Sequence, residues 1–164
     1  MTTCVEPGAR VAAPPLRVAS WLNTDHPLVL DSLRGRVIVL HAFQMLCPGC
    51  VSHGLPQAQR VQDSFSPDEV TVIGLHTVFE HHAAMTRVAL EAFVHEYRFT
   101  FPIGIDQPAE QGGVPVTMQA YALRGTPSLV LVDRTGHIRM HEFGQVPDLA
   151  LGAAIASLMA ERQA

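Results

Sequence analysis

Two cysteines separated by two residues, Cys47 and Cys50, are the side chains of this chain best suited to chemistry. They can close a small disulfide ring, and they follow an apolar run at the point where a helix is expected to begin. The free backbone N–H groups and the dipole of that helix favour a thiolate, which lowers the pKa of the first thiol from about 8.5 toward neutrality. The spacing therefore predicts a redox pair in which Cys47 is the nucleophile and Cys50 resolves the mixed disulfide.

The same spacing has two other interpretations, a zinc site and a pair of inert core cysteines. A closed zinc site needs two more ligands, commonly from a second paired motif, and the only other cysteine, Cys4, is isolated near the N-terminus. The pair could also be two inert core cysteines. The position of the pair between an expected strand and an expected helix favours redox chemistry. We expect Cys4 to be a spectator, although it could form a disulfide between chains.

A buried strand and a helix must position the two thiols. The run 37–43 is β-branched and nearly all apolar, which is typical of a central strand covered on both faces, and it ends shortly before Cys47. A helix is expected next, with apolar side chains at helical spacing from Val51 to Phe65. Pro56 lies inside this segment and should kink the helix.

The rest of the chain continues this alternation and predicts an α/β fold. Strands are expected at 16–22, 70–75 and 103–105, a hairpin at 128–132 and 138–143, and helices at 84–97, 116–123 and 148–162. The helix at 84–97 should present one apolar face made of Met85, Val88, Ala92 and Phe93. Alternating units followed by a hairpin predict a central mixed β-sheet flanked by helices on both faces.

One domain of this kind accounts for almost the whole length of 164 residues. The segment 1–15 is rich in Pro and Ala and shows no apolar periodicity, so it is expected to be an N-terminal tail. The folded domain is expected over 16–164.

Two motifs, in this order, resemble the thioredoxin-like superfamily, especially its TlpA/ResA-type thiol:disulfide oxidoreductases. The first is the apolar strand leading into Cys47-Pro48-Gly49-Cys50, and the second is the run Gly125-Thr126-Pro127-Ser128-Leu129. The resemblance implies a thioredoxin-like fold and disulfide exchange with protein substrates. It also implies two partners, which are a protein that carries a disulfide or dithiol and a separate protein that recharges the pair.

The resemblance also implies where a substrate would bind. In this family the proline that matches Pro127 is cis and packs beside the dithiol, which exposes the backbone of the preceding residue, here Thr126, to an extended substrate segment. Pro48, Gly49 and Leu46 would complete the substrate-binding surface. From the residues alone, Pro127 could instead simply begin an edge strand, where proline is tolerated.

The chain departs from this family at two positions near the pair. Most thioredoxin-like reductases carry Trp before the first cysteine, where this chain has Leu46. Six residues before Cys47 stands His41, at a position where thioredoxins have a buried Asp and TlpA-type proteins often have Asn. His41 is a candidate catalytic residue that deprotonates Cys50 during resolution, a role that suits an imidazole. The other interpretation is a neutral, hydrogen-bonded core histidine.

The residues after the pair suggest an alternative function. In peroxiredoxins a Leu-Pro pair follows the reactive cysteine at the offset that Leu55 and Pro56 have from Cys50. However, the peroxiredoxin threonine three residues before that cysteine is replaced by Cys47, and the catalytic arginine of the late strand is absent. A peroxiredoxin-like thiol peroxidase is therefore the alternative enzyme.

Nine histidines raise the question of a metal site. His81 and His82 are adjacent, and because adjacent side chains diverge, a solvated surface pair is expected. Neither a metal nor another cofactor is predicted. The non-enzymatic alternative is a thioredoxin-like copper chaperone, in which the dithiol binds copper together with a distal histidine such as His137 or His141.

The composition excludes several classes of function. All eleven basic residues are Arg, so lysine Schiff-base chemistry and a P-loop lysine are excluded. The formal charge is −4 and no basic run exists, so no nucleic-acid partner is expected. No apolar run is long enough to span a membrane, and the first residues do not resemble a secretory signal. A cytoplasmic location is predicted, with export as the alternative if a leader has been removed.

Overall fold

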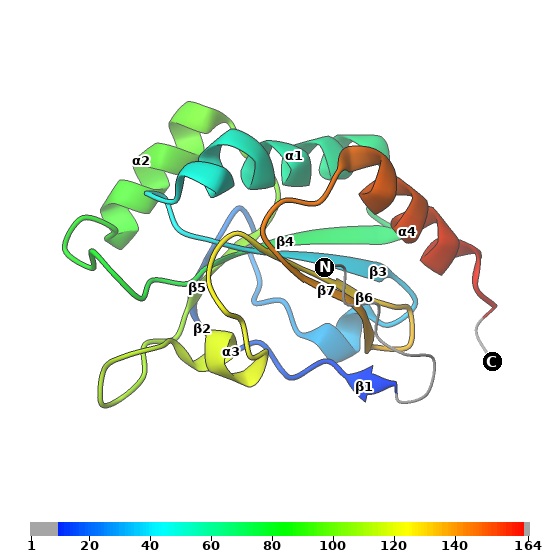
Figure 1. Cartoon of the computed structure of the whole chain (residues 1–164), viewed down its shortest axis with the longest axis horizontal. Helices are drawn as coiled ribbons and strands as arrows, with labels where there is room; N and C mark the ends of the chain where they lie inside the picture. Colours follow the sequence, from blue (N-terminus) through cyan, green and yellow to red (C-terminus); the bar gives the residue numbers. More distant parts are fainter. Residues whose placement is uncertain (1–9, 163–164) are drawn as a thin grey trace.

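The computed structural model describes residues 10–162, which form one seven-stranded sheet with helices on both faces (Figure 1). The strand order is β1-β7-β6-β3-β4-β5-β2. Strands β3, β4 and β5 are parallel, whereas all other neighbours are antiparallel, so the sheet is mixed as predicted. The strands are β1 (Val11–Ala12), β2 (Val18–Leu22), β3 (Val37–Phe43), β4 (Val70–His76), β5 (Ile103–Asp106), β6 (Ser128–Val132) and β7 (His137–Phe143).

Strand β3 lies between β4 and β6 near the centre of the sheet, and all seven of its residues are buried. Because side chains alternate along a strand, Val39 and Phe43 face one apolar cluster while Ile38 and Leu40 face the other. His41 has the parity of Val39 and therefore points to their side of the sheet. The central strand predicted from the sequence is confirmed.

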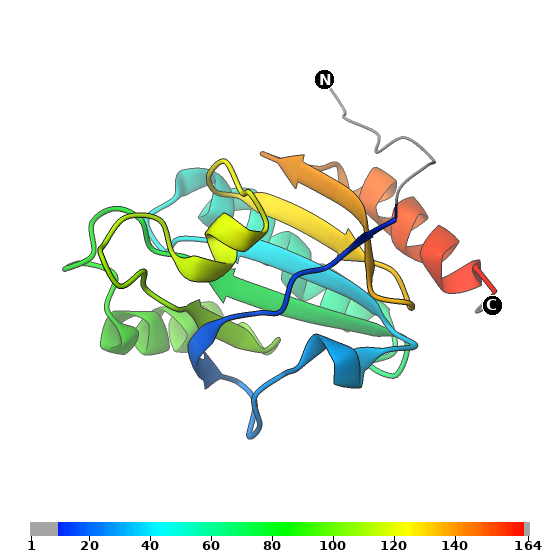
Figure 2. The ribbon, with the colours of Figure 1, turned by 90° about the horizontal axis from the view of Figure 1, so that it is seen from below.

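Three α-helices cover one face of the sheet, and one α-helix and a 3-10 helix cover the other (Figures 1 and 2). Helices α1 (Leu55–Ser64), α2 (Arg87–Tyr97) and α4 (Asp148–Ala160) pack on the face to which His41 points. Helix α3 (Val116–Ala120) and a 3-10 helix at Leu30–Leu33 cover the opposite face. No helix within residues 10–162 combines the length and apolar character needed to cross a membrane.

Helix α2 begins later, and faces differently, than its sequence pattern predicted. The side chain of Thr86 accepts a hydrogen bond from the Ala89 N–H and caps the helix there, so the start predicted at residue 84 was wrong. Of the predicted face, Met85 is buried and Phe93 is partly buried, whereas Val88 is 75% exposed and Ala92 is exposed. The buried residues within the helix are Leu90 and Val94. Apolar residues occur on two sides of this segment, so periodicity alone did not identify the buried one.

The sheet begins inside the segment that was predicted to be a tail. Val11 and Ala12 pair with Ile138 and His137 of β7 and form an edge strand. This pairing uses backbone groups of β7 that would otherwise be unpaired, and because Val11 stays exposed, it leaves no apolar pattern in the sequence. The start of the fold predicted at Leu16 is thus corrected to Val11, whereas Cys4 lies outside the described residues.

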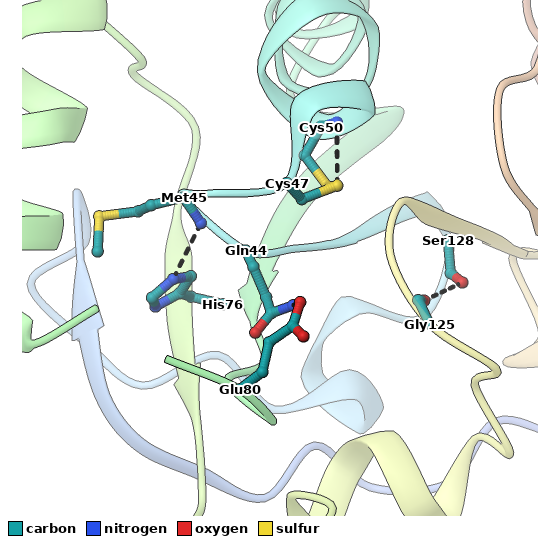
Figure 3. The surroundings of a disulfide bond; sticks show 8 residues. All are labelled: Gln44, Met45, Cys47, Cys50, His76, Glu80, Gly125 and Ser128. Atoms are coloured by element: carbon teal, nitrogen blue, oxygen red, sulfur yellow. Dashed lines mark hydrogen bonds between the residues drawn. A yellow bond between two sulfur atoms is a disulfide. The ribbon is translucent and has the colours of Figure 1, made fainter. Parts of the chain in front are cut away.

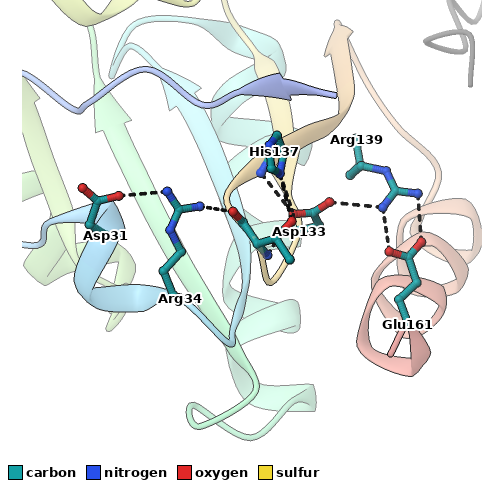
Figure 4. Close-up of polar contacts among 7 residues, drawn as sticks. Asp31, Arg34, Asp133, His137, Arg139 and Glu161 are labelled. Atoms are coloured by element: carbon teal, nitrogen blue, oxygen red, sulfur yellow. Dashed lines mark hydrogen bonds and ion pairs between the residues drawn. The ribbon is translucent and has the colours of Figure 1, made fainter. Parts of the chain in front are cut away.

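A polar network anchors the β6–β7 turn at the end of the sheet (Figure 4). Arg139 forms ion pairs with Asp133 and Glu161, which joins β7 to the end of α4. Arg34 donates to the Thr135 carbonyl in the same turn. Burial alone would raise the pKa of Asp133, but hydrogen bonds from His137, Thr135 and Arg139 outweigh it and hold that pKa below its usual range.

Candidate active site

The two cysteines lie where β3 passes into the first turn of a helix, and they are joined as a disulfide (Figure 3). Their Cα atoms are 5.2 Å apart, within the range that a disulfide requires. Helical backbone begins at Pro48, a residue suited to the first helical position because its missing N–H would be unpaired there anyway. Cys47 thus stands at the N-terminal end of the helix, as the spacing predicted.

The two cysteines have unequal surroundings. Cys47 is partly exposed, whereas Cys50 is 0% exposed within the core beneath α1 and α4. The Cys50 N–H donates to Sγ of Cys47 over 3.2 Å. A donor at that distance stabilises negative charge on the Cys47 sulfur once the disulfide is opened. The residue that a substrate can reach is therefore also the one whose thiolate the backbone supports.

A π-helical segment that begins at the second cysteine leads into α1. It covers Cys50–Gly54 and ends directly before Leu55 and Pro56, which are the first residues of α1. Because proline lacks the N–H that an α-helical interior needs, the wider turns place Pro56 at the start of a new helix, where no donor is required. The kink predicted from Pro56 thus takes the form of a change in helical type.

Pro127 lies against the first turns of this helix. The Thr126–Pro127 peptide bond is cis, as the family resemblance implied. A Cβ on Gly49 would lie 3.3 Å from Cδ of Pro127, and a Cβ on Gly54 would lie 3.4 Å from its Cβ. The two motifs that stand far apart in the sequence are therefore in contact, and a side chain in place of Gly49 would force Pro127 to shift.

His41 is buried below the same turn of the helix. Its Nδ1 atom would lie 3.7 Å from a Cβ on Gly54, and its Nε2 atom has no hydrogen-bond partner. Burial, and then the charge of nearby His53, lower the pKa of His41 to about 4, so the ring is neutral at neutral pH. A neutral ring with a free nitrogen can accept a proton but is a weak base. The other interpretation of His41, a core histidine held by hydrogen bonds, is not met at Nε2 because this atom has no partner.

Sequence reasoning missed a clamp between the helix and the β7–α4 connection. Nε2 of His53 lies 2.9 Å from the carbonyl oxygen of Val146, and the Gln57 amide donates to the same oxygen over 2.7 Å. Gln57 also donates to Asp148 at the start of α4. The available signal was the i, i+4 spacing of two polar residues on a helix directly after the cysteines.

The segment that leads from β3 to the pair is held by buried polar side chains (Figure 3). The Met45 N–H donates to Nε2 of His76 over 3.4 Å, and burial lowers the pKa of His76 to about 4. The amide of Gln44 accepts from the Phe79 N–H and donates to Glu80. Leu46, the next residue before the pair, is 57% exposed. These contacts fix the backbone so that Leu46 and Cys47 face outward.

No metal centre is formed by the described residues 10–162, where no three His, Cys, Asp or Glu side chains gather closely enough. His81 and His82 are exposed, as expected of a surface pair. His137 contacts Thr135, and Nε2 of His141 lies 2.8 Å from the Tyr121 carbonyl oxygen. Neither histidine is gathered with the dithiol, so the geometry does not favour the copper-chaperone alternative.

Comparisons with known proteins agree with this geometry. The AhpC/TSA family model matches residues 11–141. The crystal structure of a thioredoxin-like superfamily protein, SPOA0173, is 56% identical with a TM-score of 0.91 and covers 94% of this chain and 99% of its own. The structure of a thiol-disulfide isomerase from Corynebacterium glutamicum is 49% identical with a TM-score of 0.87 and covers 92% of this chain and 98% of its own.

One curated relative is much longer than this chain. Protein DipZ of Mycobacterium bovis is 28% identical over 137 residues, which cover 81% of this chain but 18% of DipZ. The chain therefore corresponds to a small part of DipZ, and this likeness adds nothing about the activity of the whole protein.

Proposed function

This chain belongs to the AhpC/TSA family and is a thioredoxin-like thiol:disulfide oxidoreductase, and on that basis we propose that it exchanges disulfides with protein substrates through Cys47 and Cys50. The unequal burial of the two residues carries the proposal. A substrate sulfur can approach the partly exposed Cys47, whereas Cys50 is buried within bonding reach of it. Cys47 is accordingly the nucleophile, and Cys50 is the resolving thiol.

The proposed exchange has two steps. In the reduced protein, the Cys47 thiolate attacks one sulfur of a substrate disulfide, whose S–S bond breaks and releases the other sulfur as a thiolate. Cys50 then loses its proton and attacks Sγ of Cys47, which releases the second substrate sulfur and forms the internal disulfide. The substrate gains two electrons and two protons, and a separate redox partner returns the pair to the dithiol.

The substrate-binding surface in this proposal surrounds Cys47. Leu46 and Pro48, the residues before and after Cys47, are exposed, and Gly49 is partly exposed. Thr126 and Pro127 lie across from them and are half-buried. An extended substrate segment would lie on these side chains with its backbone beside Thr126.

His41 takes part in the second step of the proposal. Its Nε2 atom, which has no hydrogen-bond partner, and its position beneath Gly54 suit a group that accepts the Cys50 proton in a buried site. Because burial lowers the pKa of this imidazole to about 4, its contribution should be smaller than that of a histidine with an ordinary pKa.

The burial of Cys50 and one similar structure bear on the class of reaction. In the peroxidase alternative, Cys50 would have to meet peroxide, but it is fully buried, which favours exchange at Cys47. The 49% identical structure is named a thiol-disulfide isomerase, which makes isomerisation of substrate disulfides the second candidate reaction for the same pair.

Trapping experiments test the order of attack. We expect Cys50→Ser to accumulate covalent adducts with disulfide-containing proteins, because the mixed disulfide on Cys47 can no longer be resolved. Mass spectrometry after non-reducing electrophoresis would locate the adduct. Cys47→Ser is the matched control and should trap nothing. Adducts on Cys50 in that control, and none in Cys50→Ser, would contradict the proposal.

A further inference from the structure

An exposed aromatic side chain stands at the end of β7, close to the cis-proline. Phe143 is 51% exposed and pairs in the sheet with Ser128. The next residue, Gly144, donates its N–H to the Pro127 carbonyl over 2.8 Å. The backbone of Phe143 is therefore fixed relative to the proposed substrate-binding surface, although much of its ring is open to solvent.

The ring is held in place on two sides. A Cβ on Gly125 would lie 2.9 Å from the Phe143 ring, so the ring packs directly on the backbone there. The Ser128 hydroxyl donates to the Gly125 carbonyl over 2.7 Å and fixes that turn (Figure 3). The guanidinium carbon of Arg124 lies 5.6 Å from the ring centroid, a distance typical of a cation–π contact.

The segment that carries Phe143 continues past the cysteines. Nε2 of Gln145 would lie 4.0 Å from a Cβ on Gly49, which directly precedes Cys50. Pro127 contacts the same glycine. Through Gly144 the backbone of Phe143 is thus joined to Pro127, which approaches Gly49, and Arg124 stands three residues before Pro127 in the same connection.

Arg124 forms no ion pair with any of the residues that the structure describes. It is exposed, and none of the ion pairs formed among residues 10–162 includes it. The chain as a whole has a formal charge of −4, so this exposed cation near the cis-proline is opposite in sign to the molecule's net charge. A guanidinium in such a place is suited to a carboxylate, and the adjacent ring is suited to an apolar side chain.

We propose that Phe143 and Arg124 form a specificity site, which selects substrate segments that carry a large apolar side chain and an acidic side chain beside the reacting cysteine. The inference rests on the proposed function and deepens it by naming the chemistry of the preferred substrate. The apolar side chain packs on the Phe143 ring. The acidic side chain pairs with Arg124, whose ring neighbour removes water from one side of the guanidinium.

Short peptides with one cysteine, held as a mixed disulfide with 2-mercaptoethanol, test this site. The acidic peptide has Phe before the cysteine and Glu after it, the basic peptide has Lys in place of Glu, and the third peptide has Gly in place of Phe. The second-order rate constant for reduction by the reduced protein is measured for each. The rate with bis(2-hydroxyethyl) disulfide, which is small and neutral, serves as the reference for each variant.

We expect the protein to reduce the acidic peptide about fivefold faster than the basic peptide, although the net charge of the protein is negative. The preference should vanish in Arg124→Gln. The unaltered protein should reduce the Phe peptide about tenfold faster than the Gly peptide. This preference should be lost in Phe143→Ala. Arg34→Gln removes the same charge beyond the opposite end of β3, so it should keep both preferences.

Equal rates for the acidic and basic peptides, or a preference that survives Arg124→Gln, would overturn the specificity site while leaving disulfide exchange intact. Failure to reduce even bis(2-hydroxyethyl) disulfide would overturn the proposed function, and the specificity site with it. The reference rate thus separates the two failures.

Discussion

His41 is a polar residue in an apolar part of the core. It occupies a central strand among apolar neighbours, and its Nε2 atom is buried without a partner. An unpaired buried polar atom is costly, so its presence beneath the reactive helix needs a physical reason. The proposed acceptance of the Cys50 proton would supply one, because this thiol is fully buried and must lose its proton before it can resolve the mixed disulfide.

Replacing His41 should slow the second step of the exchange more than the first. We expect His41→Ala to lower the rate of mixed-disulfide resolution about tenfold, at or below the lower end of general acid–base effects because the imidazole is a weak base. Stopped-flow measurement with a fluorescent mixed disulfide separates resolution from the attack by Cys47. If both steps slow equally, or if resolution is unchanged, His41 acts only through packing.

Among the elements, α3 depends most visibly on a single buried side chain. Asp106, at the end of β5, accepts hydrogen bonds from the N–H groups of Thr117 and Met118 over 2.8 and 2.9 Å. It also accepts one from the Thr77 hydroxyl at the end of β4. One carboxylate thereby satisfies two of the N-terminal N–H groups of a five-residue helix and joins that helix to two strands.

Removing this carboxylate should destabilise the protein strongly. We expect Asp106→Ala to lower the free energy of unfolding by about 3 kcal/mol, because three buried donors lose their acceptor. Asp106→Asn keeps one acceptor oxygen and should lose less. Urea denaturation measures both, with the exposed Asp68→Ala as the control. A loss in Asp106→Ala no larger than in the control would refute this account of α3.

At the scale of the whole molecule, two buried histidines make folding sensitive to pH. Burial lowers the pKa of both His41 and His76 to about 4 in the folded protein, whereas an unfolded chain has the ordinary value of about 6.5. Between these two values the unfolded chain binds protons that the folded protein does not. Stability is therefore complete above pH 6.5 and falls as the pH decreases toward 4.

The free energy of unfolding should fall by about 4 kcal/mol between pH 7.5 and pH 5, with about half from each histidine. This is a large part of the stability of an ordinary domain. Urea denaturation at several pH values measures it. His76→Gln should remove about half of the pH dependence, and the exposed His81→Asn should leave it unchanged. A pH dependence that persists in full in His76→Gln would exclude this histidine as a source.

Much of the fold and the centre of the site could be predicted from local patterns in the sequence. The buried run of β3, the spacing of Cys47 and Cys50, and the turn before β7 each express a property of neighbouring residues. Gly136 adopts the positive φ that this turn requires. Such features depend on side-chain period and backbone sterics, which act over a few residues.

The contacts that complete the site were decided by the tertiary structure. The clamp from His53 to Val146 spans 93 positions, and no local pattern shows which carbonyl a helical histidine will meet. The packing of Phe143 on Gly125 likewise exists only because β7 pairs with β6. The sequence by itself determined the central strand, the β6–β7 turn and the reactive pair, since these follow from interactions between near neighbours. The proposed substrate-binding surface arises only when distant elements pack together. The same is true of the difference in burial between Cys47 and Cys50.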